Sequence, residues 1–192
     1  VGNAGLLSTS CNGSNCVVSG SYAAVISSSS FQFPLVASST DGGATWTYTI
    51  EGSSTLPSGF VNNGVFYNIN CDGTNCVASG SYDAVIGSSS FQSPLLARST
   101  DGGATWTYPI EGSSTLPSSF SGGGVFYNAT CDDDNCVASG SYDAVIGSIS
   151  FQSPLLASST DGGATWTYTI ESASTLPTGF AGEGVLLNTS TK

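Results

Sequence analysis

Residues 39–46 read Ser-Thr-Asp-Gly-Gly-Ala-Thr-Trp, and the same eight letters return at residues 99–106 and 159–166. The three tryptophans of the chain, Trp46, Trp106 and Trp166, each end one copy. Self-similarity at a fixed period is the signature of a repeat protein. The 192-residue chain therefore contains one 60-residue unit copied three times, rather than one domain of ordinary sequence.

The period divides the chain into repeats 1–60, 61–120 and 121–180, followed by 181–192 as the start of a fourth copy. A unit of this size buries a poor core alone, so neighbouring units are expected to share one within a single repeat domain.

One repeat contains four segments typical of β-strands and no helical periodicity. In the second repeat these segments are 64–70, 77–86, 94–99 and one that begins at 105–108. Four short antiparallel strands separated by turn residues describe a propeller blade. The sequence therefore predicts an all-β fold of three propeller-like blades, either open or completed between molecules.

Three details of the second repeat can be checked against a structure. Gly80 is expected at a bulge or a close backbone approach. Pro94 is expected at the first position of the third strand, where it removes no ladder bond. Residues 88–93, which carry Phe91, are expected to form a polar loop.

The charge of the chain excludes two classes of partner. The net charge is −11, and Arg98 and Lys192 are the only basic residues. A polyanion or an anionic membrane surface would repel such a chain, so neither nucleic acid nor a membrane is expected as a partner. No apolar run has the length of a membrane-spanning helix.

The cysteines fall in three Cys-x4-Cys pairs, one per repeat. Disulfides would staple the first hairpin of each blade, and each is worth about 2 kcal/mol by loop entropy. Zinc is the alternative, but two thiols per blade and a chain without histidine do not supply four convergent ligands. Disulfides and abundant Ser, Thr and Asn indicate a secreted or cell-surface protein. The expected pairs are Cys11–Cys16, Cys71–Cys76 and Cys131–Cys136.

The repeated octamer matches the Asp-box pattern Ser-x-Asp-x-Gly-x-Thr-Trp at every defined position. The chain thus resembles sialidase-like propellers and sortilin-type receptors, and its Cys-x4-Cys-Val-Ala-x-Gly segment resembles repeats of secreted bacterial proteins of unassigned activity. The resemblance implies a structural turn at the blade periphery with no part in chemistry. The residues it assigns to that turn are Asp41, Trp46, Asp101, Trp106, Asp161 and Trp166.

The same resemblance suggests a glycosidase, but the residues for one are missing. Sialidases hold the substrate carboxylate with three arginines, and this chain has one arginine in total. Carboxylates at equivalent repeat positions are held apart by the blade spacing and cannot share one pocket. Without histidine there is no Ser-His-Asp or Cys-His nucleophile. We therefore expect no catalytic residue and no cofactor; the acids considered are Glu51, Glu111, Glu171, Asp83 and Asp143.

Two kinds of modification or ion site were considered. Oxygen ligands at 132–135 could suit calcium, but the equivalent loops at 12–15 and 72–75 do not keep them, so a solvated acidic turn is preferred. Asn-x-Ser/Thr sequons make Asn12, Asn128 and Asn188 candidate glycosylation sites.

Sugar binding would need exposed aromatic residues. The tryptophans belong to the repeated octamer and are expected to be packed. The remaining aromatic candidates are Tyr22, Tyr82, Tyr142, Phe31, Phe91 and Phe151, although loop aromatics often pack on a neighbouring blade.

The first strand of the repeat occurs four times, at both ends of the chain as well as inside it. Three blades are fewer than a closed propeller needs, so open faces and edges invite association. We expect a non-enzymatic extracellular structural protein that assembles with itself into a filament or array, head to tail and by terminal strand addition. Two other arrangements fit the open blade count: the chain is part of a longer array of blades, or two copies close a six-bladed ring. The alternative is an adhesin- or lectin-like propeller that binds glycans or proteins. The candidate assembly residues are Leu6, Leu7, Val185, Leu186 and Leu187.

Overall fold

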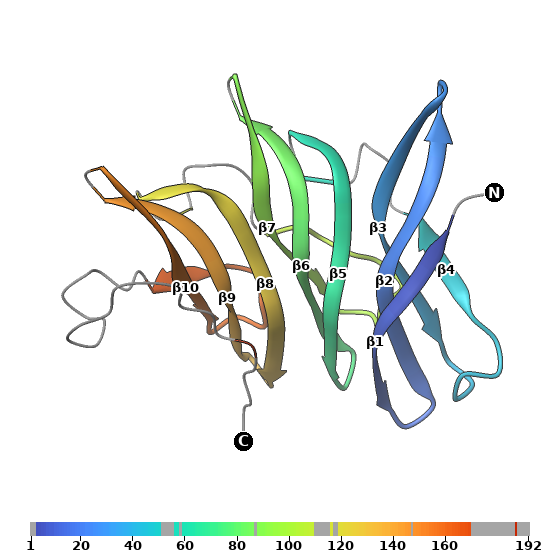
Figure 1. Cartoon of the computed structure of the whole chain (residues 1–192). Coiled ribbons are helices and arrows are strands. Elements are labelled where there is room, and N and C mark those ends of the chain that lie inside the picture. Colours follow the sequence, from blue (N-terminus) through green and yellow to red (C-terminus); the bar gives the residue numbers. More distant parts are fainter. Residues whose placement is uncertain are drawn as a thin grey trace.

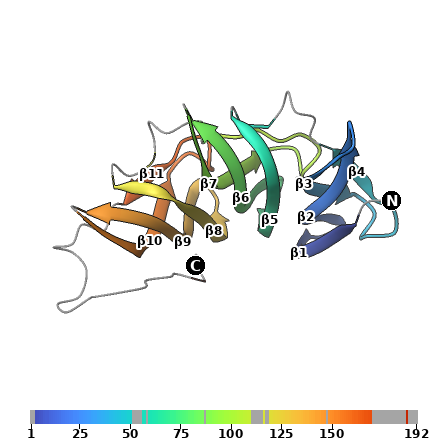
Figure 2. The same ribbon diagram turned by 45° about the horizontal axis from the view of Figure 1, so that its top comes forward.

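The computed structural model describes residues 3–50, 56–57, 59–86, 88–109, 116, 119–146, 148–169 and 187. Every regular element in these ranges is a β-strand, which confirms the predicted all-β class. The strands form three antiparallel sheets that stand side by side in an open arc of propeller-like blades (Figures 1 and 2). Within the same ranges, no helix is long and apolar enough to cross a membrane.

Each blade is built from the strands of one repeat, with neighbouring strands paired in chain order. The first blade contains β1 (Ala4–Asn12), β2 (Asn15–Ile26), β3 (Ser29–Ser39) and β4 (Thr47–Ile50). The second contains β5 (Phe60–Asp72), β6 (Asn75–Ile86) and β7 (Ser89–Ser99). The third contains β8 (Phe120–Asp132), β9 (Asn135–Ile146), β10 (Ile149–Ser159) and β11 (Thr167–Thr169). The finer repeat boundaries, and the fourth copy at 181–192, stay predictions.

Two expectations about the third strand are wrong. Residues 89–93 belong to β7, so Phe91 lies in a strand and not in a loop. Pro94 lies inside β7, opposite Ser81, and not at its start. In the first blade the equivalent residue is Pro34. The strand β4 pairs with residues 35–38 of β3 and ends before Pro34, so the absent N–H of this proline removes no hydrogen bond to β4.

The fourth strand is reduced in the second blade. There it shrinks to a single bridge between Arg98 and Thr107. Residue 109 is proline in this repeat, whereas the other two repeats have Thr49 and Thr169, which pair with β3 and β10. A proline has no N–H to donate, so the ladder cannot continue through this position.

Gly80 is found at both a close approach and a bulge, as predicted. A Cβ on Gly80 would overlap the backbone oxygen of Val65 on the neighbouring strand. The register between β5 and β6 shifts at the same place, between Phe66 and Asn68.

The blades pack face to face and share their cores, as the small size of the repeat predicts. Val17, Phe33 and Val36 of the first blade form one buried cluster with Phe66 and Trp106 of the second. Val77 and Leu96 of the second blade form the next cluster with residues of the third, among them Phe126, Tyr142 and Leu155.

Glycines allow the blades to approach closely at one repeated position. A Cβ on Gly64 would collide with Cδ of Pro34, and a Cβ on Gly124 would collide with Cδ of Pro94. Each proline thus packs against the first strand of the following blade, which we call its inner strand (β5 in the second blade and β8 in the third). A side chain at this position would push two blades apart.

Candidate functional site

The Asp-Gly-Gly turn (residues 39–46, 99–106 and 159–166) uses its polar groups within itself. In the second blade, Asp101 Oδ1 accepts from the Ser99 hydroxyl at 2.8 Å and from the Thr105 N–H at 2.8 Å, and Oδ2 accepts from the Thr105 hydroxyl at 2.6 Å. The Trp106 ring N–H donates to the Gly103 carbonyl at 3.0 Å. The other two copies repeat these bonds.

These bonds lower the pKa of the turn carboxylates, because they favour the charged form. The Thr45 hydroxyl, with smaller contributions from the Thr45 N–H and Ser39, lowers the pKa of Asp41 to about 2. For Asp101, burial acts in the opposite direction, but the bonds from Thr105 and Ser99 still lower its pKa. The pKa of Asp161 is lowered in the same way by Thr165.

Each turn is also tied to the first hairpin of its own blade, and the turns of the second and third blades contact the preceding blade as well. The Gly102 N–H donates to the Thr74 carbonyl at 2.9 Å. Gly103 lies so close to Val17 of the first blade that its missing Cβ would stand 2.8 Å from a Val17 methyl carbon. In the second and third blades the turn therefore helps to hold neighbouring blades together, and the bonds given above for its carboxylate all lie within the turn.

All three expected disulfides are formed, and no described cysteine is free. Each links directly opposite residues of the first hairpin, with Cα–Cα distances of 4.1, 4.0 and 4.1 Å. Three disulfides in one chain are consistent with an oxidising environment.

Polar side chains connect the inner strands of successive blades. The hydroxyls of Ser8 and Ser10 accept from the N–H groups of Ile69 and Cys71, at 3.2 and 3.0 Å. One blade further on, the same register repeats with Asn68, Asn70 and Asp72 as acceptors for Ala129, Cys131 and Asp133. This ladder is not among the predictions made from the sequence, although its signal is present there as a polar residue at every second position of the first strand.

Most of the aromatic candidates for sugar binding are packed between blades. Tyr82 and Tyr142 are each 2% exposed. Phe60 connects the rings of Phe33 and Tyr82 in a stack with centroid distances of 5.6 and 5.8 Å. Tyr22, Phe31 and Phe91 are half-buried and pack against the first core cluster, and Phe151 packs against the second. The prediction that Tyr82 and Tyr142 are exposed rings available to bind sugar is therefore wrong.

The candidate glycosylation and acidic residues are scattered. Asn12 is exposed at the first hairpin, and Asn128 is half-buried in β8, at the register of the inter-blade ladder. Asp83 accepts from the Asn63 amide at 2.6 Å. In the described parts of the chain, no group of three or more acidic or cysteine side chains is placed to hold a metal ion. Glycosylation stays a prediction, and Asn188, Glu51, Glu111 and Glu171 lie outside the described residues.

The candidate assembly residues of β1 lie on the surface. Leu6 is 51% and Leu7 is 57% exposed, whereas Phe66 and Phe126, which occupy the repeat position of Leu6, are 0% exposed. At the other end of the chain, Leu187 is 67% exposed, and Val185 and Leu186 lie outside the described residues.

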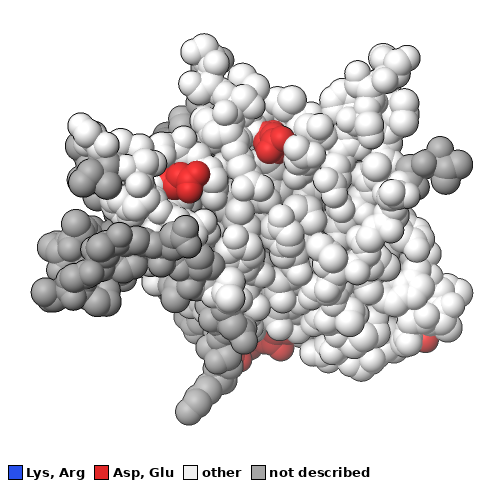
Figure 3. All heavy atoms as spheres, in the orientation of Figure 1, with Lys and Arg blue, Asp and Glu red and all other residues white. Residues whose placement is uncertain are grey.

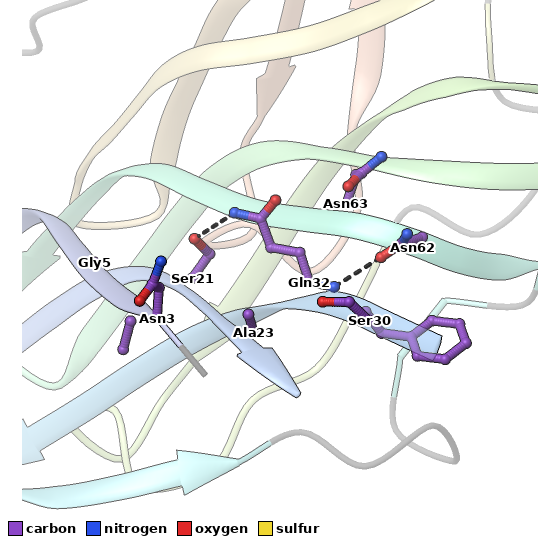
Figure 4. Close-up of a pocket in the computed structure, with 10 residues that line it drawn as sticks. Asn3, Gly5, Ser21, Ala23, Ser30, Gln32, Asn62 and Asn63 are labelled. Atoms are coloured by element: carbon purple, nitrogen blue, oxygen red, sulfur yellow. Dashed lines mark hydrogen bonds between the residues drawn. The ribbon is translucent and has the colours of Figure 1, made fainter. Parts of the chain in front are cut away.

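A polar groove lies between the first and second blades (Figure 4). Its volume is about 470 Å³, and residues of β1, β2, β3 and β5 line it. The face of the molecule in Figure 3 shows isolated acidic side chains and no basic ones.

Comparisons with known proteins add little to this description. No family model and no curated protein matches the chain. The chain is similar to a solved structure described as "YCF48 bound to D1 peptide", at 12% identity and a TM-score of 0.31, over 88% of this chain and 83% of that one. At this distance the likeness transfers no function.

Proposed function

We propose that the chain is a non-enzymatic, secreted structural protein of the Asp-box repeat family, which assembles with itself head to tail into a filament or surface array. The observation that carries the proposal is the contrast between Tyr48, which is 57% exposed, and Tyr108, which is 8% exposed. Both hold the same repeat position. The second blade buries this position against the first, whereas no blade among the described residues packs on this face of the first.

The rest of this face shows the same contrast. Tyr22 is half-buried, whereas its counterparts Tyr82 and Tyr142 on the second and third blades are buried. The apolar face of the first blade is therefore an unfinished core face, and burying it against a partner would be favourable.

The opposite end of the arc carries the complementary surface. Val17 and Val36 are fully buried under the second blade, and Val77 and Leu96 are buried under the third. Their counterparts on the third blade, Val137 and Leu156, are only half-buried. A first blade from another copy would meet at this surface the residue types that the second and third blades meet inside the chain. Contacts of this head-to-tail kind generate rings or filaments.

One residue argues that the junction is not a plain copy of the internal contact. The position that is glycine in the second and third blades, at Gly64 and Gly124, is Ala4 in the first blade. In a plain copy of the internal contact, the Cβ of Ala4 would collide with Pro154 of the preceding copy, because a Cβ on either glycine would collide with the equivalent proline. The terminal copy of the strand restores glycine, at Gly184.

We therefore infer terminal strand addition at the junction. Residues 184–189 of one copy take the place beside β2 of the next copy, where β1 otherwise lies. No residue of β1 is buried, so this strand is the weakest-held inner strand to displace. The disulfide between Cys11 and Cys16 keeps the displaced strand attached.

The test is the assembly state of the wild-type chain and of a variant that lacks residues 181–192. Light scattering over a wide concentration range and negative-stain microscopy should find growing head-to-tail assemblies for the wild type and monomers for the deletion. Wild-type protein that stays monomeric at every concentration would refute self-assembly. If the deletion variant forms assemblies as large as those of the wild type, strand addition is refuted but self-assembly is not.

A further inference from the structure

Six of the ten residues that line the groove between the first and second blades carry a side-chain amide or hydroxyl. They are Asn3, which precedes β1, Ser21 of β2, Ser30 and Gln32 of β3, and Asn62 and Asn63 of β5; Ala4, Gly5, Ala23 and Phe31 complete the lining. None of the ten residues that line it carries a charge. Its volume of about 470 Å³ is that of a small-molecule pocket.

Hydrogen bonds fix the amides on two sides of the groove. The Asn62 side-chain carbonyl accepts from the Gln32 backbone N–H at 2.7 Å, and the Gln32 amide donates to the Ser21 hydroxyl at 2.8 Å (Figure 4). The NH₂ of Asn62 and the carbonyl of Gln32 take no part in these two bonds. A fixed donor and a fixed acceptor thus remain at the groove.

Asn63 lines this wall with its backbone in the left-handed region. Its φ is 53°, in the left-handed region, and its side-chain amide donates to Asp83 at 2.6 Å. The equivalent residue in the third blade is Gly123, with φ of 60°. Asparagine adopts this region more readily than other residues with a side chain, so both repeats keep the left-handed backbone, and the first groove alone gains an amide there.

The chain contains its own control for this groove. Between the second and third blades the bond from Gln92 to Ser81 is kept, at 3.2 Å, but the two asparagines are replaced by Gly122 and Gly123. Residues 64–68 and 124–128, which follow directly, are identical. The fold therefore accepts glycine at both positions, and the pair of asparagines is not a requirement of the blade.

We propose that this first groove binds a neutral saccharide. Amides and hydroxyls both donate and accept hydrogen bonds, as sugar hydroxyls do, and the half-buried ring of Phe31 offers an apolar wall. An acidic ligand would meet no basic group among the lining residues and would be repelled by a chain of net charge −11. The site lies within one chain and goes beyond the proposed self-assembly.

The test uses the full chain at a dilution where it is monomeric. Maltotriose, cellotriose, mannotriose and chitotriose are titrated, with sialyllactose as the acidic comparison, and the side-chain amide resonances of Gln32, Asn62 and Asn63 are followed by NMR. At least one neutral sugar should shift these resonances in a saturable way. The double change Asn62→Gly with Asn63→Gly should weaken that binding at least tenfold, and Asn12→Gly, at an exposed turn, should leave it unchanged.

The unfolding midpoint of each variant shows whether it is folded. If the double variant does not fold, Asn3→Ala takes its place as the test of binding. The proposal is overturned if no neutral sugar shifts the three amides, or if sialyllactose binds as tightly as the neutral sugars. It is equally overturned if the folded glycine variant, or failing that Asn3→Ala, binds as well as the wild type.

Discussion

Cδ of Pro34 lies against the backbone of Gly64 at a distance that leaves no room for a Cβ. This contact fixes how closely the first two blades approach, and Pro94 repeats it on Gly124. The first prediction follows from it. Gly64→Ala should reduce the free energy of unfolding by about 1–3 kcal/mol, because the added methyl group overpacks the blade interface.

Ala4→Gly is the matched control, since Ala4 holds the same repeat position on an open face. It should cost no more than about 1 kcal/mol, the ordinary penalty of glycine in a strand. Chemical denaturation measures both changes. Equal losses for the two variants would show that the proline contact does not set the blade spacing.

The β2–β3 turn of the first blade predicts a stabilising change. Ser27 and Ser28 have φ of 50° and 69°, and the other two repeats have glycine at the position of Ser27. Ser27→Gly should raise the free energy of unfolding by about 1 kcal/mol, because glycine adopts the left-handed region without steric cost. Thermal unfolding checks it, and an unchanged or lower midpoint would contradict the assignment of strain to this turn.

The lowered pKa values of the Asp-Gly-Gly turn predict that the folded protein loses stability at low pH. The pKa of Asp41 in the folded chain is about 2, below the value of about 4 for an unfolded aspartate. A lowered pKa contributes stability that is fully present above pH 4 and is lost as the pH falls towards 2. The unfolding midpoint of the wild type should drop within this window, and the drop should be smaller in Asp41→Asn. The same drop in both proteins would show that this carboxylate does not control the transition.

The disulfides predict a measurable loss of stability when one of them is removed. Replacing Cys71 and Cys76 by serine should cost about 2 kcal/mol, because the cross-link no longer restricts the unfolded chain. Denaturation of this variant beside the wild type measures the loss. An unchanged stability, or free thiols in the untreated protein, would contradict the stapled hairpin.

Much of the blade could be predicted from sequence because its determinants are local. The turn around Asp101 follows from residues within a few positions of it, and Cys71 and Cys76 can reach one another across a two-residue turn. The strand ends were harder. Ser89 and Ser90 read as a loop, but they pair with Ile86 and Val85 in a hairpin.

The partners in contacts between blades could not be predicted, because each partner lies in another repeat and local sequence does not say which residue it is. Asn68 resembles a solvent-facing strand residue, yet its side chain accepts the N–H of Ala129, 61 residues away. The effect of Pro34 on Gly64 is of the same kind. The asparagines of the groove also carry no motif, and only the comparison with Gly122 and Gly123 separates them from ordinary turn residues.

Sedimentation velocity of the wild type, Gly184→Ala and Ala4→Gly over a range of concentrations tests the proposed assembly most directly. The wild type and Ala4→Gly are expected to associate with rising concentration, and Gly184→Ala is expected to stay monomeric, because its new Cβ meets Pro154. A wild type that remains monomeric throughout would contradict self-assembly. Association of Gly184→Ala at wild-type strength would contradict the addition of the terminal strand.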